Sequence, residues 1–465
     1  MTNLGYNPED PIAAISTALA PGAIGIVRTS GKNCIDLVSK IFSRPQALLK
    51  AQGNSLVYGW IIDSTSENKI DEVMLGVYRS PKSFTGEDMV EIFCHGGVNV
   101  VTAILNLLLK NGFRQAQKGE FTFRAYINGK TDLTKAEAVK EIIDSKTDAG
   151  RGRAAGRLAG NLFTEIDGIK KLIVDTLASI EVEIEYPEDE ETIANTFDKA
   201  NLEEAKKRLT SLADSWKSEK LYQDGARVVL AGKTNAGKSS LFNSLLKEER
   251  AIVSDIEGTT RDWLESWVSF DGIPARLFDT AGLRKTDDVI EARGVELTKD
   301  LSHDADIILY LADSRNSLSN EDMDFIKSQG QVPLVMVWNK CDLSGMDSNR
   351  QPLPQGAVSQ VFISAKTGTG VGELCTLVKE IISRQTSSQS DRPQAGLGSE
   401  RQKVSVSEAL ECVEHALLIA DKGDYGLDAV VQDLEDCLDS LGEVTGSVTP
   451  DDILGSIFSH FCVGK

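Results

Sequence analysis

The sequence predicts a multidomain protein with an α+β N-terminal domain, an all-α domain formed from two sequence segments, and an α/β domain inserted between those segments. Its 465 residues suffice for about three domains, each with its own core. Helical periodicity occurs on both sides of a central region in which strand-like and helix-like runs alternate. We therefore expect an N-terminal domain at residues 1–118, a helical domain at 119–215 and 384–465, and an inserted domain at 216–383.

The N-terminal 118 residues mix short β-like runs with helical stretches. Strand-like runs occur at 23–27, 73–78 and 90–93, and a helical run follows at 101–110. Turn residues such as Gly96 and Gly97 separate them. This mixture favours an α+β domain.

Two apolar seams predict the helical domain. The first comprises Leu158, Leu162, Ile166, Ile169, Ile173, Leu177 and Ile180, whose spacing is that of a long amphipathic helix. The second follows a polar linker at 385–403 and comprises Leu427, Val431, Leu434, Leu438 and Leu441. Because the α/β region lies between the seams, one domain is predicted to be inserted within the other.

Composition excludes several broad classes of protein. The 50 Lys+Arg and 70 Asp+Glu residues give a formal net charge of −20, which argues against a general polyanion binder. A nucleic-acid substrate would therefore need a local patch or a basic partner. The seven cysteines are an odd number without a Cys-x-x-Cys pair, which disfavours a disulfide framework and a structural zinc site. Apolar runs are too short to span a membrane and no secretory leader is apparent, so we expect a cytoplasmic protein.

A phosphate-binding loop is predicted directly after a short apolar strand at 227–231. The next residues are Gly232-Lys233-Thr234-Asn235-Ala236-Gly237-Lys238-Ser239, which fit the pattern in its required context of strand, loop and helix. Gly232 and Gly237 let the backbone curl so that amide groups face a β-phosphate. Lys238 supplies a charge between the β- and γ-phosphates, and the Ser239 hydroxyl can bind Mg²⁺.

Four further motifs follow in the order typical of translation-factor-like GTPases. They are Gly258-Thr259-Thr260, Asp279-Thr280-Ala281-Gly282, Asn339-Lys340-Cys341-Asp342 and Ser364-Ala365-Lys366. The last three each follow a predicted strand, at whose carboxyl end ligands bind open α/β sheets. The sequence therefore predicts a P-loop GTPase domain.

Each motif has a predicted task. The Asp342 carboxylate can accept hydrogen bonds from guanine N1 and N2, which adenine cannot offer, while Asn339 and Lys340 would support the loop and the base. The backbone of residues 364–366 would meet guanine O6. Thr260 would bind Mg²⁺ and sense the γ-phosphate, and Asp279 would hold the metal through water.

One position departs from the signalling GTPases. Leu283 follows Asp279-Thr280-Ala281-Gly282, where a glutamine would orient water in that class. An apolar side chain cannot position water, so hydrolysis needs another polar group or an ion.

The whole chain resembles the MnmE (TrmE) family of tRNA modification GTPases. The similarity rests on the ending Phe461-Cys462-Val463-Gly464-Lys465 together with Asn235-Ala236-Gly237-Lys238-Ser239 and Gly258-Thr259-Thr260-Arg261-Asp262. Further similar blocks are Ser83-Phe84-Thr85-Gly86-Glu87-Asp88, His95-Gly96-Gly97, Gly119-Glu120-Phe121-Thr122 and Asn128-Gly129-Lys130-Thr131-Asp132-Leu133.

The resemblance implies catalytic and ion-binding residues in the GTPase domain. Lys238, Thr260 and the water-positioning Glu291 would be catalytic, with Mg²⁺ held by Ser239 and Thr260. K⁺, which would supply the positive charge of an arginine finger, would be bound by Asn235, Ser254, Ile256 and Thr259; Ser254 stands where many members have threonine and keeps the oxygen. Together with these residues, the GTP-binding set includes Ala236, Gly237, Ser240, Asp255, Glu257, Gly258, Asp279, Thr280, Ala281, Gly282, Asn339, Lys340, Asp342, Ser364, Ala365 and Lys366.

The resemblance also implies a folate site and partners. 5-Formyl-tetrahydrofolate or a related folate would contact Arg28, Glu91, Lys130 and Lys465, with the carboxylate on the pterin edge and the cations on the glutamyl tail. The alternative for each of these residues is a surface ion pair. The family further implies a homodimer, K⁺-dependent pairing of GTPase domains, and a FAD-dependent partner subunit in a heterotetramer or larger assembly.

Two smaller features have competing interpretations. The aromatic neighbours Phe458 and Phe461 favour a buried Cys462, although a catalytic thiol is the alternative. Arg151, Arg153 and Arg157 could contact tRNA, but a solvated helix face is the favoured interpretation.

The function expected from these observations is GTP hydrolysis in a complex that modifies C5 of the wobble uridine (U34) of tRNA. Carboxymethylaminomethyl or aminomethyl groups would be added there, the folate would donate one carbon, and the partner's FAD would perform redox chemistry. The alternatives are a ribosome-assembly or other regulatory GTPase switch, a folate-dependent transferase with a regulatory GTPase insert, and a non-enzymatic scaffold. Neither end of the chain is rich in Lys and Arg, which disfavours the ribosome-assembly alternative.

Overall fold

The computed structural model describes residues 9–63, 67–185, 199–246, 265–279, 304–330, 332–343, 351–386, 395–420, 427–448 and 451–464. They form two compact units. The first unit comprises Met1–Lys140, Leu158–Lys199 and Glu411–Lys465, and the second comprises Glu141–Arg157 and Ala200–Leu410. Among the described helices, none combines the length and apolar composition needed to cross a membrane.

The N-terminal part of the first unit is a mixed sheet, which confirms the predicted α+β domain. Its strands, in the order β3-β4-β5-β2-β1-β6, are antiparallel except for the β1–β6 pair. The bounds are β1 (Ile12–Ile15), β2 (Gly22–Ser30), β3 (Ser55–Ile62), β4 (Lys69–Tyr78), β5 (Met89–Gly96) and β6 (Arg114–Gln115).

Helices cover one face of this sheet. Buried side chains of α1 (Cys34–Ser39) and α3 (Val98–Lys110) form one core with the inward residues of the strands. The short helix α2 (Pro45–Leu49) adds Leu48 to it. The strands β3 and β4 alternate between buried and exposed residues, so that their other face carries the exposed Leu56, Tyr58 and Met74.

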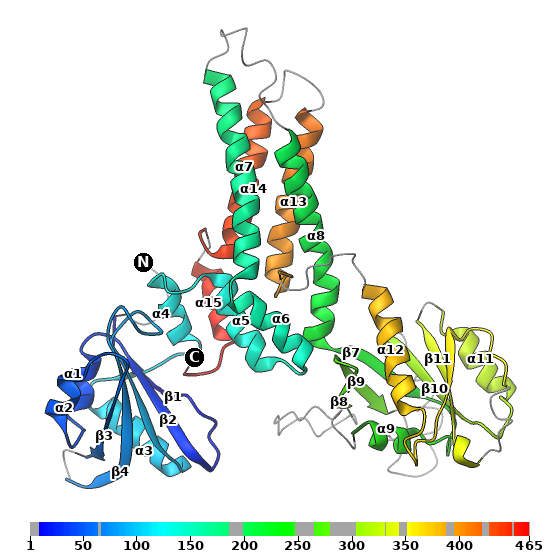
Figure 1. Cartoon of the computed structure of the whole chain (residues 1–465), viewed down its shortest axis with the longest axis horizontal. Coiled ribbons are helices and arrows are strands. Elements are labelled where there is room, and N and C mark those ends of the chain that lie inside the picture. Colours follow the sequence, from blue (N-terminus) through cyan, green and yellow to red (C-terminus); the bar gives the residue numbers. More distant parts are fainter. Residues whose placement is uncertain are drawn as a thin grey trace. The chain divides into compact units, whose positions relative to one another are not determined.

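The helical part of the first unit contains the two predicted seams. Helices α7 (Asn161–Glu185) and α14 (Leu427–Thr445) run side by side, as Figure 1 shows. On α7 the buried seam residues include Ile166 and Ile173, whereas α14 buries Leu434 and Leu441 of its seam and leaves Val431 and Leu438 half-buried. A second core joins α4 (Glu120–Ile127), α5 (Leu133–Asp144) and α15 (Asp451–Ser459) through Phe123, Leu133 and Phe458.

Helix α7, which the first seam predicts, begins later than that seam. Leu158 ends a separate helix α6 (Asp148–Leu158), and α7 begins at Asn161. Gly160 between them has φ +99°, a left-handed conformation that breaks a helix and favours glycine. The seam from Leu162 to Ile180 is therefore correct, whereas the inclusion of Leu158 was wrong.

The second unit is dominated by a doubly wound α/β sheet, as the alternation of runs predicts. Its order is β12-β11-β10-β7-β9-β8, and every pair is parallel except β8–β9. The bounds are β7 (Ala226–Ala231), β8 (Glu265–Phe270), β9 (Ile273–Asp279), β10 (Ile307–Asp313), β11 (Leu334–Asn339) and β12 (Ser359–Phe362).

Helices pack on both faces of this sheet. The helices α9 (Lys238–Leu246) and α12 (Val371–Thr386) share one core with the strands, and α11 (Asn320–Ser328) belongs to the core on the opposite face. Helix α8 (Lys199–Asp224) leads into β7, and α13 (Glu400–Ala420) follows the sheet domain in sequence. The carboxyl ends of the central parallel strands thus meet at one edge, where the predicted nucleotide motifs lie.

Candidate functional site

The predicted phosphate loop connects β7 to α9. Gly232 has φ +130°, and a Cβ added there would come within 2.2 Å of the Leu311 carbonyl oxygen. Gly237 has φ +98°, and its added Cβ would lie 2.1 Å from Asn339 Nδ2. Both positions therefore require glycine, for backbone conformation and for space.

Lys238 lies against this loop at the start of α9. Its side chain is buried, and its Nζ donates hydrogen bonds to the carbonyl oxygens of Gly232 at 2.5 Å and Lys233 at 2.9 Å. Ser239 follows in the first helical turn and is exposed. A cation and a hydroxyl at a glycine-rich helix start suit a phosphate with its Mg²⁺.

Asn339 joins the phosphate loop to the base-recognition loops. Its side chain is buried, and its Nδ2 donates to the Ala236 carbonyl oxygen at 2.9 Å. Its Oδ1 accepts hydrogen bonds from the backbone amides of Lys340 at 2.8 Å and Ala365 at 3.0 Å. One side chain thus holds three of the sequence-predicted segments in fixed relation.

The predicted base-recognition carboxylate, Asp342, is also held in place. Ser364 Oγ donates to Asp342 Oδ1 at 2.7 Å, while the Asp342 side chain remains exposed. Lys340 has φ +65°, and its Nζ lies 3.0 Å from Asp313 Oδ2. The geometry brings Asn339, Lys340, Asp342 and Ser364 together as the motifs predict.

Of the three backbone amides at residues 364–366, two already have partners in the structure. Within residues 364–366, the Ser364 amide donates to the Thr369 carbonyl oxygen at 2.9 Å and the Ala365 amide donates to Asn339 Oδ1. Of the three amides, that of Lys366 would therefore be the donor to guanine O6.

Many of the expected site residues lie outside the described residues. This applies to Ser254, Asp255, Ile256, Glu257, Gly258, Thr259, Thr260, Thr280, Ala281, Gly282, Leu283, Glu291 and Lys465. Asp279 closes β9, where its backbone lies beside Leu230 of β7. The expected K⁺ ligand Asn235 lies in the phosphate loop with φ +61° and is exposed.

Two residues that the motifs did not identify lie at the same edge. Asp313 is the last residue of β10 and pairs in register with Asn339 of β11. Arg315 Nε and Nη2 donate to the two Asp313 carboxylate oxygens at 2.9 and 2.8 Å. The only local sequence signal is that Asp313 ends an apolar strand at the ligand-binding edge, which is no motif by itself.

The predicted folate residues Arg28 and Glu91 form an ion pair in the first unit. They are direct neighbours across β2 and β5, and Arg28 Nε lies 2.8 Å from Glu91 Oε1. Arg28 also donates from Nη1 to the Gly464 carbonyl oxygen at 3.3 Å, and its guanidinium carbon lies 5.5 Å from the centre of the Phe84 ring. A carboxylate, a cation and an aromatic ring therefore meet beside the C-terminal tail.

The third described folate candidate, Lys130, contacts the loop that carries Phe84. Its Nζ donates to the Pro81 carbonyl oxygen at 2.9 Å, and its side chain is exposed. Tyr78 adds a hydroxyl, which donates to Glu91 Oε2 at 3.3 Å. Burial and the Glu91 charge raise the pKa of Tyr78, so this phenol stays protonated.

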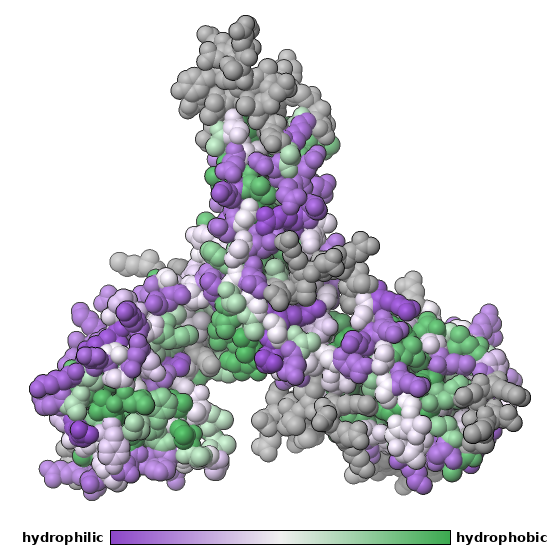
Figure 2. All heavy atoms as spheres, viewed as in Figure 1, coloured by the Kyte–Doolittle hydropathy of each residue, from purple (hydrophilic) through white to green (hydrophobic). Residues whose placement is uncertain are grey.

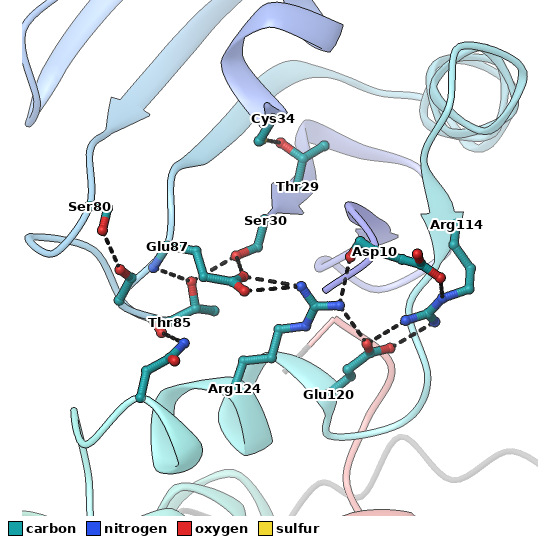
Figure 3. Close-up of polar contacts among 12 residues, drawn as sticks. Asp10, Thr29, Ser30, Cys34, Ser80, Thr85, Glu87, Arg114, Glu120 and Arg124 are labelled. Carbon is teal, nitrogen blue, oxygen red and sulfur yellow. Dashed lines mark hydrogen bonds and ion pairs between the residues drawn. The ribbon is translucent and has the colours of Figure 1, made fainter. Parts of the chain in front are cut away.

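A buried ion network supports the same loop (Figure 3). Arg124 is fully buried, and its Nη1 donates to Glu87 Oε2 at 3.1 Å while its Nη2 donates to Glu120 Oε1 at 2.9 Å. Glu87 accepts a further bond from Ser30 Oγ at 2.7 Å, and Arg114 Nη2 lies 2.6 Å from Glu120 Oε1. The loop is thereby tied to both α4 and β2.

Cys462 differs from its sequence expectation. Its side chain is exposed, whereas the flanking Phe458 and Phe461 are buried, so the favoured burial was wrong. The tail is extended here: Val463 forms a bridge with Lys118, and the Gly119 amide donates to the Cys462 carbonyl oxygen at 3.3 Å. The backbone, and not the thiol, makes this contact with the N-terminal part.

The arginine cluster also differs from its expectation of a solvated face. Arg157 is buried and bonds to Glu141 Oε2 at 2.7 Å and Glu219 Oε2 at 2.8 Å. Arg153 pairs with the same Glu219, and its guanidinium carbon lies 4.2 Å from the centre of the Tyr222 ring. Because the Glu219 side chain is itself buried on α8, it requires these counter-charges. Only Arg151 of the three is exposed.

Two family models and several full-length relatives, all of one family, match this chain. A family model for the MnmE helical domain matches residues 133–462, and one for the GTP-binding protein TrmE N-terminus matches residues 11–130. A tRNA modification GTPase MnmE of Treponema denticola is 52% identical, with 99% of each chain covered. Proteins of the same name from Treponema pallidum strain Nichols and Borrelia turicatae are 43% and 39% identical, covering 99% and 100% of each chain respectively. The chain belongs to the MnmE family.

Proposed function

We propose that this protein is the GTP-hydrolysing component of a system that modifies C5 of the tRNA wobble uridine. The observation that carries the proposal is Asn339, which links the phosphate loop through Ala236 to the base loops through Lys340 and Ala365. This side chain would hold the proposed phosphate-recognition and guanine-recognition segments together. The full-length relatives named as tRNA modification GTPases support the tRNA assignment.

Nucleotide binding is proposed to use residues that the structure describes. Lys238 would exchange its two loop carbonyl partners for the β- and γ-phosphates, and Asp342 would accept hydrogen bonds from guanine N1 and N2. The Ser364 hydroxyl holds Asp342 through one oxygen, which would keep the carboxylate in position for the base. The Lys366 amide would donate to guanine O6.

The hydrolytic residues are part of the same proposal. Glu291 would orient the attacking water in line with the γ-phosphate, and Thr260 would sense that phosphate. Ser239 and Thr260 would hold Mg²⁺, and Asn235, Ser254, Ile256 and Thr259 would hold K⁺; their hydroxyl, amide and carbonyl oxygens are the donors that such hard cations prefer. Both ions supply positive charge for the developing phosphate charge.

The N-terminal site is proposed to bind a folate through Arg28, Glu91, Lys130 and Lys465. Support comes from the contact between Arg28 and Glu91 beside Phe84, because this arrangement offers a carboxylate for the pterin edge and an aromatic surface. The 5-formyl-tetrahydrofolate or a related folate would be the one-carbon donor.

The partners that we propose are a second copy of this chain and a FAD-dependent subunit, on the grounds of exposed apolar surface and net charge. Figure 2 shows hydrophobic side chains gathered on the N-terminal part of the chain. Independently of that view, Leu56, Tyr58 and Met74 of β3 and β4 are exposed. Such a face suits a homodimer. Because the protein has a net charge of −20, tRNA would be bound mostly through a FAD-dependent partner subunit. The complex would act in the cytoplasm.

The deciding experiment is mass spectrometry of wobble nucleosides from cells that lack this gene. We expect loss of the C5 aminomethyl-type modification, its recovery with the wild-type gene, and no recovery with Lys238→Ala. A normal nucleoside profile accompanied by a ribosome-assembly defect would instead favour the regulatory GTPase alternative.

A further inference from the structure

Asp313 pairs with two cations, Lys340 and Arg315, beside the segment that carries the proposed guanine-recognition carboxylate. Asp313 ends β10 opposite Asn339 of β11, and only 10% of its side chain is exposed. Its Oδ2 lies 3.0 Å from Lys340 Nζ and accepts a hydrogen bond from Arg315 Nη2 at 2.8 Å. Its Oδ1 accepts from both Nε and the backbone amide of Arg315, at 2.9 and 3.1 Å.

These contacts keep Asp313 ionised. Hydrogen bonds from Arg315, and then from Lys340, hold the pKa of Asp313 well below its usual range despite partial desolvation. The acid therefore acts as a permanent negative partner at neutral pH for both cations.

The segment that carries a second carboxylate, Asp342, runs close to Arg315, because the Ser314 amide donates to the Asn339 carbonyl oxygen at 2.9 Å. The hydrogen bonds and charge of Asp313, and in addition the charge of Asp342, raise the pKa of Arg315. Asp342 is exposed and is held by Ser364 at one oxygen. Arg315 is 48% exposed, which leaves it room to change its rotamer if Asp313 no longer holds it.

We propose that Asp313 is a positioning residue for guanine specificity, which holds Arg315 away from Asp342 so that this carboxylate stays available to the base. An arginine paired with Asp342 would occupy the oxygens that accept from guanine N1 and N2, because the guanidinium fork matches a carboxylate in the same way. The inference rests on the proposed GTP binding and adds a determinant outside the sequence motifs.

The 2-amino group of guanine makes the effect measurable. Inosine triphosphate lacks this group but keeps N1, the ribose and the phosphates of GTP. Blocking Asp342 therefore weakens GTP more than inosine triphosphate, whereas a displaced Lys340, which would contact the ring, affects the two nucleotides alike. The ratio of their affinities separates loss of specificity from general damage to the site.

The experiment measures the dissociation constants of GTP and inosine triphosphate for the full-length protein with Mg²⁺, by competition with a fluorescent GDP analogue. We expect Asp313→Asn to lower the preference for GTP by roughly tenfold, as for loss of a charged hydrogen bond. Arg315→Ala should keep the wild-type preference. The double variant should regain most of the preference lost in Asp313→Asn, because no guanidinium remains to occupy Asp342.

A matched control is Asp304→Asn, which removes the exposed Arg227–Asp304 pair of the same unit, whose charged atoms are 3.3 Å apart, and should change neither constant. An unchanged preference in Asp313→Asn, or a double variant that stays as unselective as the single one, overturns the inference alone. A wild-type protein that binds neither nucleotide contradicts the proposed function, and the inference with it.

Discussion

Asn339 Nδ2 and the Ala236 carbonyl oxygen are joined by a buried 2.9 Å hydrogen bond between residues that are 103 positions apart in sequence. This contact connects the last residue of β11 to the middle of the phosphate loop. It means that the base loops and the phosphate loop cannot move independently without leaving a buried carbonyl unsatisfied.

We expect Asn339→Ala to weaken GTP and GDP binding at least tenfold and to destabilise the α/β domain by about 2 kcal/mol. The reason is that the Ala236 carbonyl and the Lys340 and Ala365 amides lose their partner together. Isothermal titration and chemical denaturation measure the two effects. Asn316→Ala, at an exposed position nearby, is the control and should alter neither. Wild-type affinity in Asn339→Ala would show that the link is dispensable.

Gly237→Ala should abolish nucleotide binding at micromolar concentrations. The new methyl group would meet Asn339 Nδ2 at 2.1 Å, and the residue would have to keep φ +98°. Gly372→Ala in α12 is matched in chemistry but meets no heavy atom within 4 Å, so it should bind normally. Fluorescence titration with a labelled GDP compares the two, and equal affinities would contradict the steric argument.

Breaking the buried Arg124 network should destabilise the N-terminal part strongly. Arg124→Met leaves Glu87 and Glu120 without a shared counter-charge, and we expect a loss of about 3–5 kcal/mol. Arg151→Met removes an exposed pair with Asp148 and should cost less than about 1 kcal/mol. Denaturant unfolding measures the difference. Similar losses in both variants would mean that burial does not determine the worth of these pairs.

The same network predicts a dependence of stability on acid. Burial alone would raise the pKa of Glu120, but hydrogen bonds from Arg114, the Gln117 amide and Arg124 lower it below the ordinary 4.5. A lowered native pKa contributes stability above pH 4.5 that is lost as the pH falls through the native value. Glu120→Gln should therefore flatten the acid limb of the curve of unfolding free energy against pH. An acid limb as steep as that of the wild type would assign the effect to other carboxylates.

His95 offers a titration with the opposite sign. Its Nδ1 lies 2.7 Å from Asp71 Oδ1, and this hydrogen bond raises the pKa of His95 above 6.5. The stabilising contribution is present below pH 6.5 and is lost as the pH rises through the native value. Asp71→Asn should return the pKa toward 6.5, as followed by NMR of the imidazole protons. A His95 pKa that stays at the wild-type value in this variant would contradict the assignment of the shift to Asp71.

Local patterns predicted the fold well because each depends on neighbouring residues. The apolar spacing from Leu162 to Ile180 identified α7, and the glycines at 232 and 237 identified the phosphate loop. Tertiary partners are not visible in such patterns. Glu219 lies 62 positions from Arg157, and nothing in the local sequence shows that this arginine is buried beside it.

In the candidate site too, local motifs were predictable from the sequence and tertiary contacts were not. The motifs predicted the grouping of Asn339, Asp342 and Ser364, because strand ends in a parallel sheet converge. Asp313 was missed, since a single acid after a strand has no motif and gains its meaning only from the register with Asn339. Cys462 was misjudged because its aromatic neighbours turn inward while the extended tail carries the thiol outward.

Arg157 contacts both chain segments that flank the α/β sheet. It bonds to Glu219 near the end of α8 and to the Gly396 carbonyl oxygen at 3.2 Å, and Gln223 donates to the Gly398 carbonyl oxygen at 2.6 Å. The chain therefore leaves for β7 and returns from α12 at points one side chain apart. A host whose entry and exit points coincide can gain or lose a whole domain as a cassette, and replacing residues 225–395 by a short glycine linker should leave this junction closed.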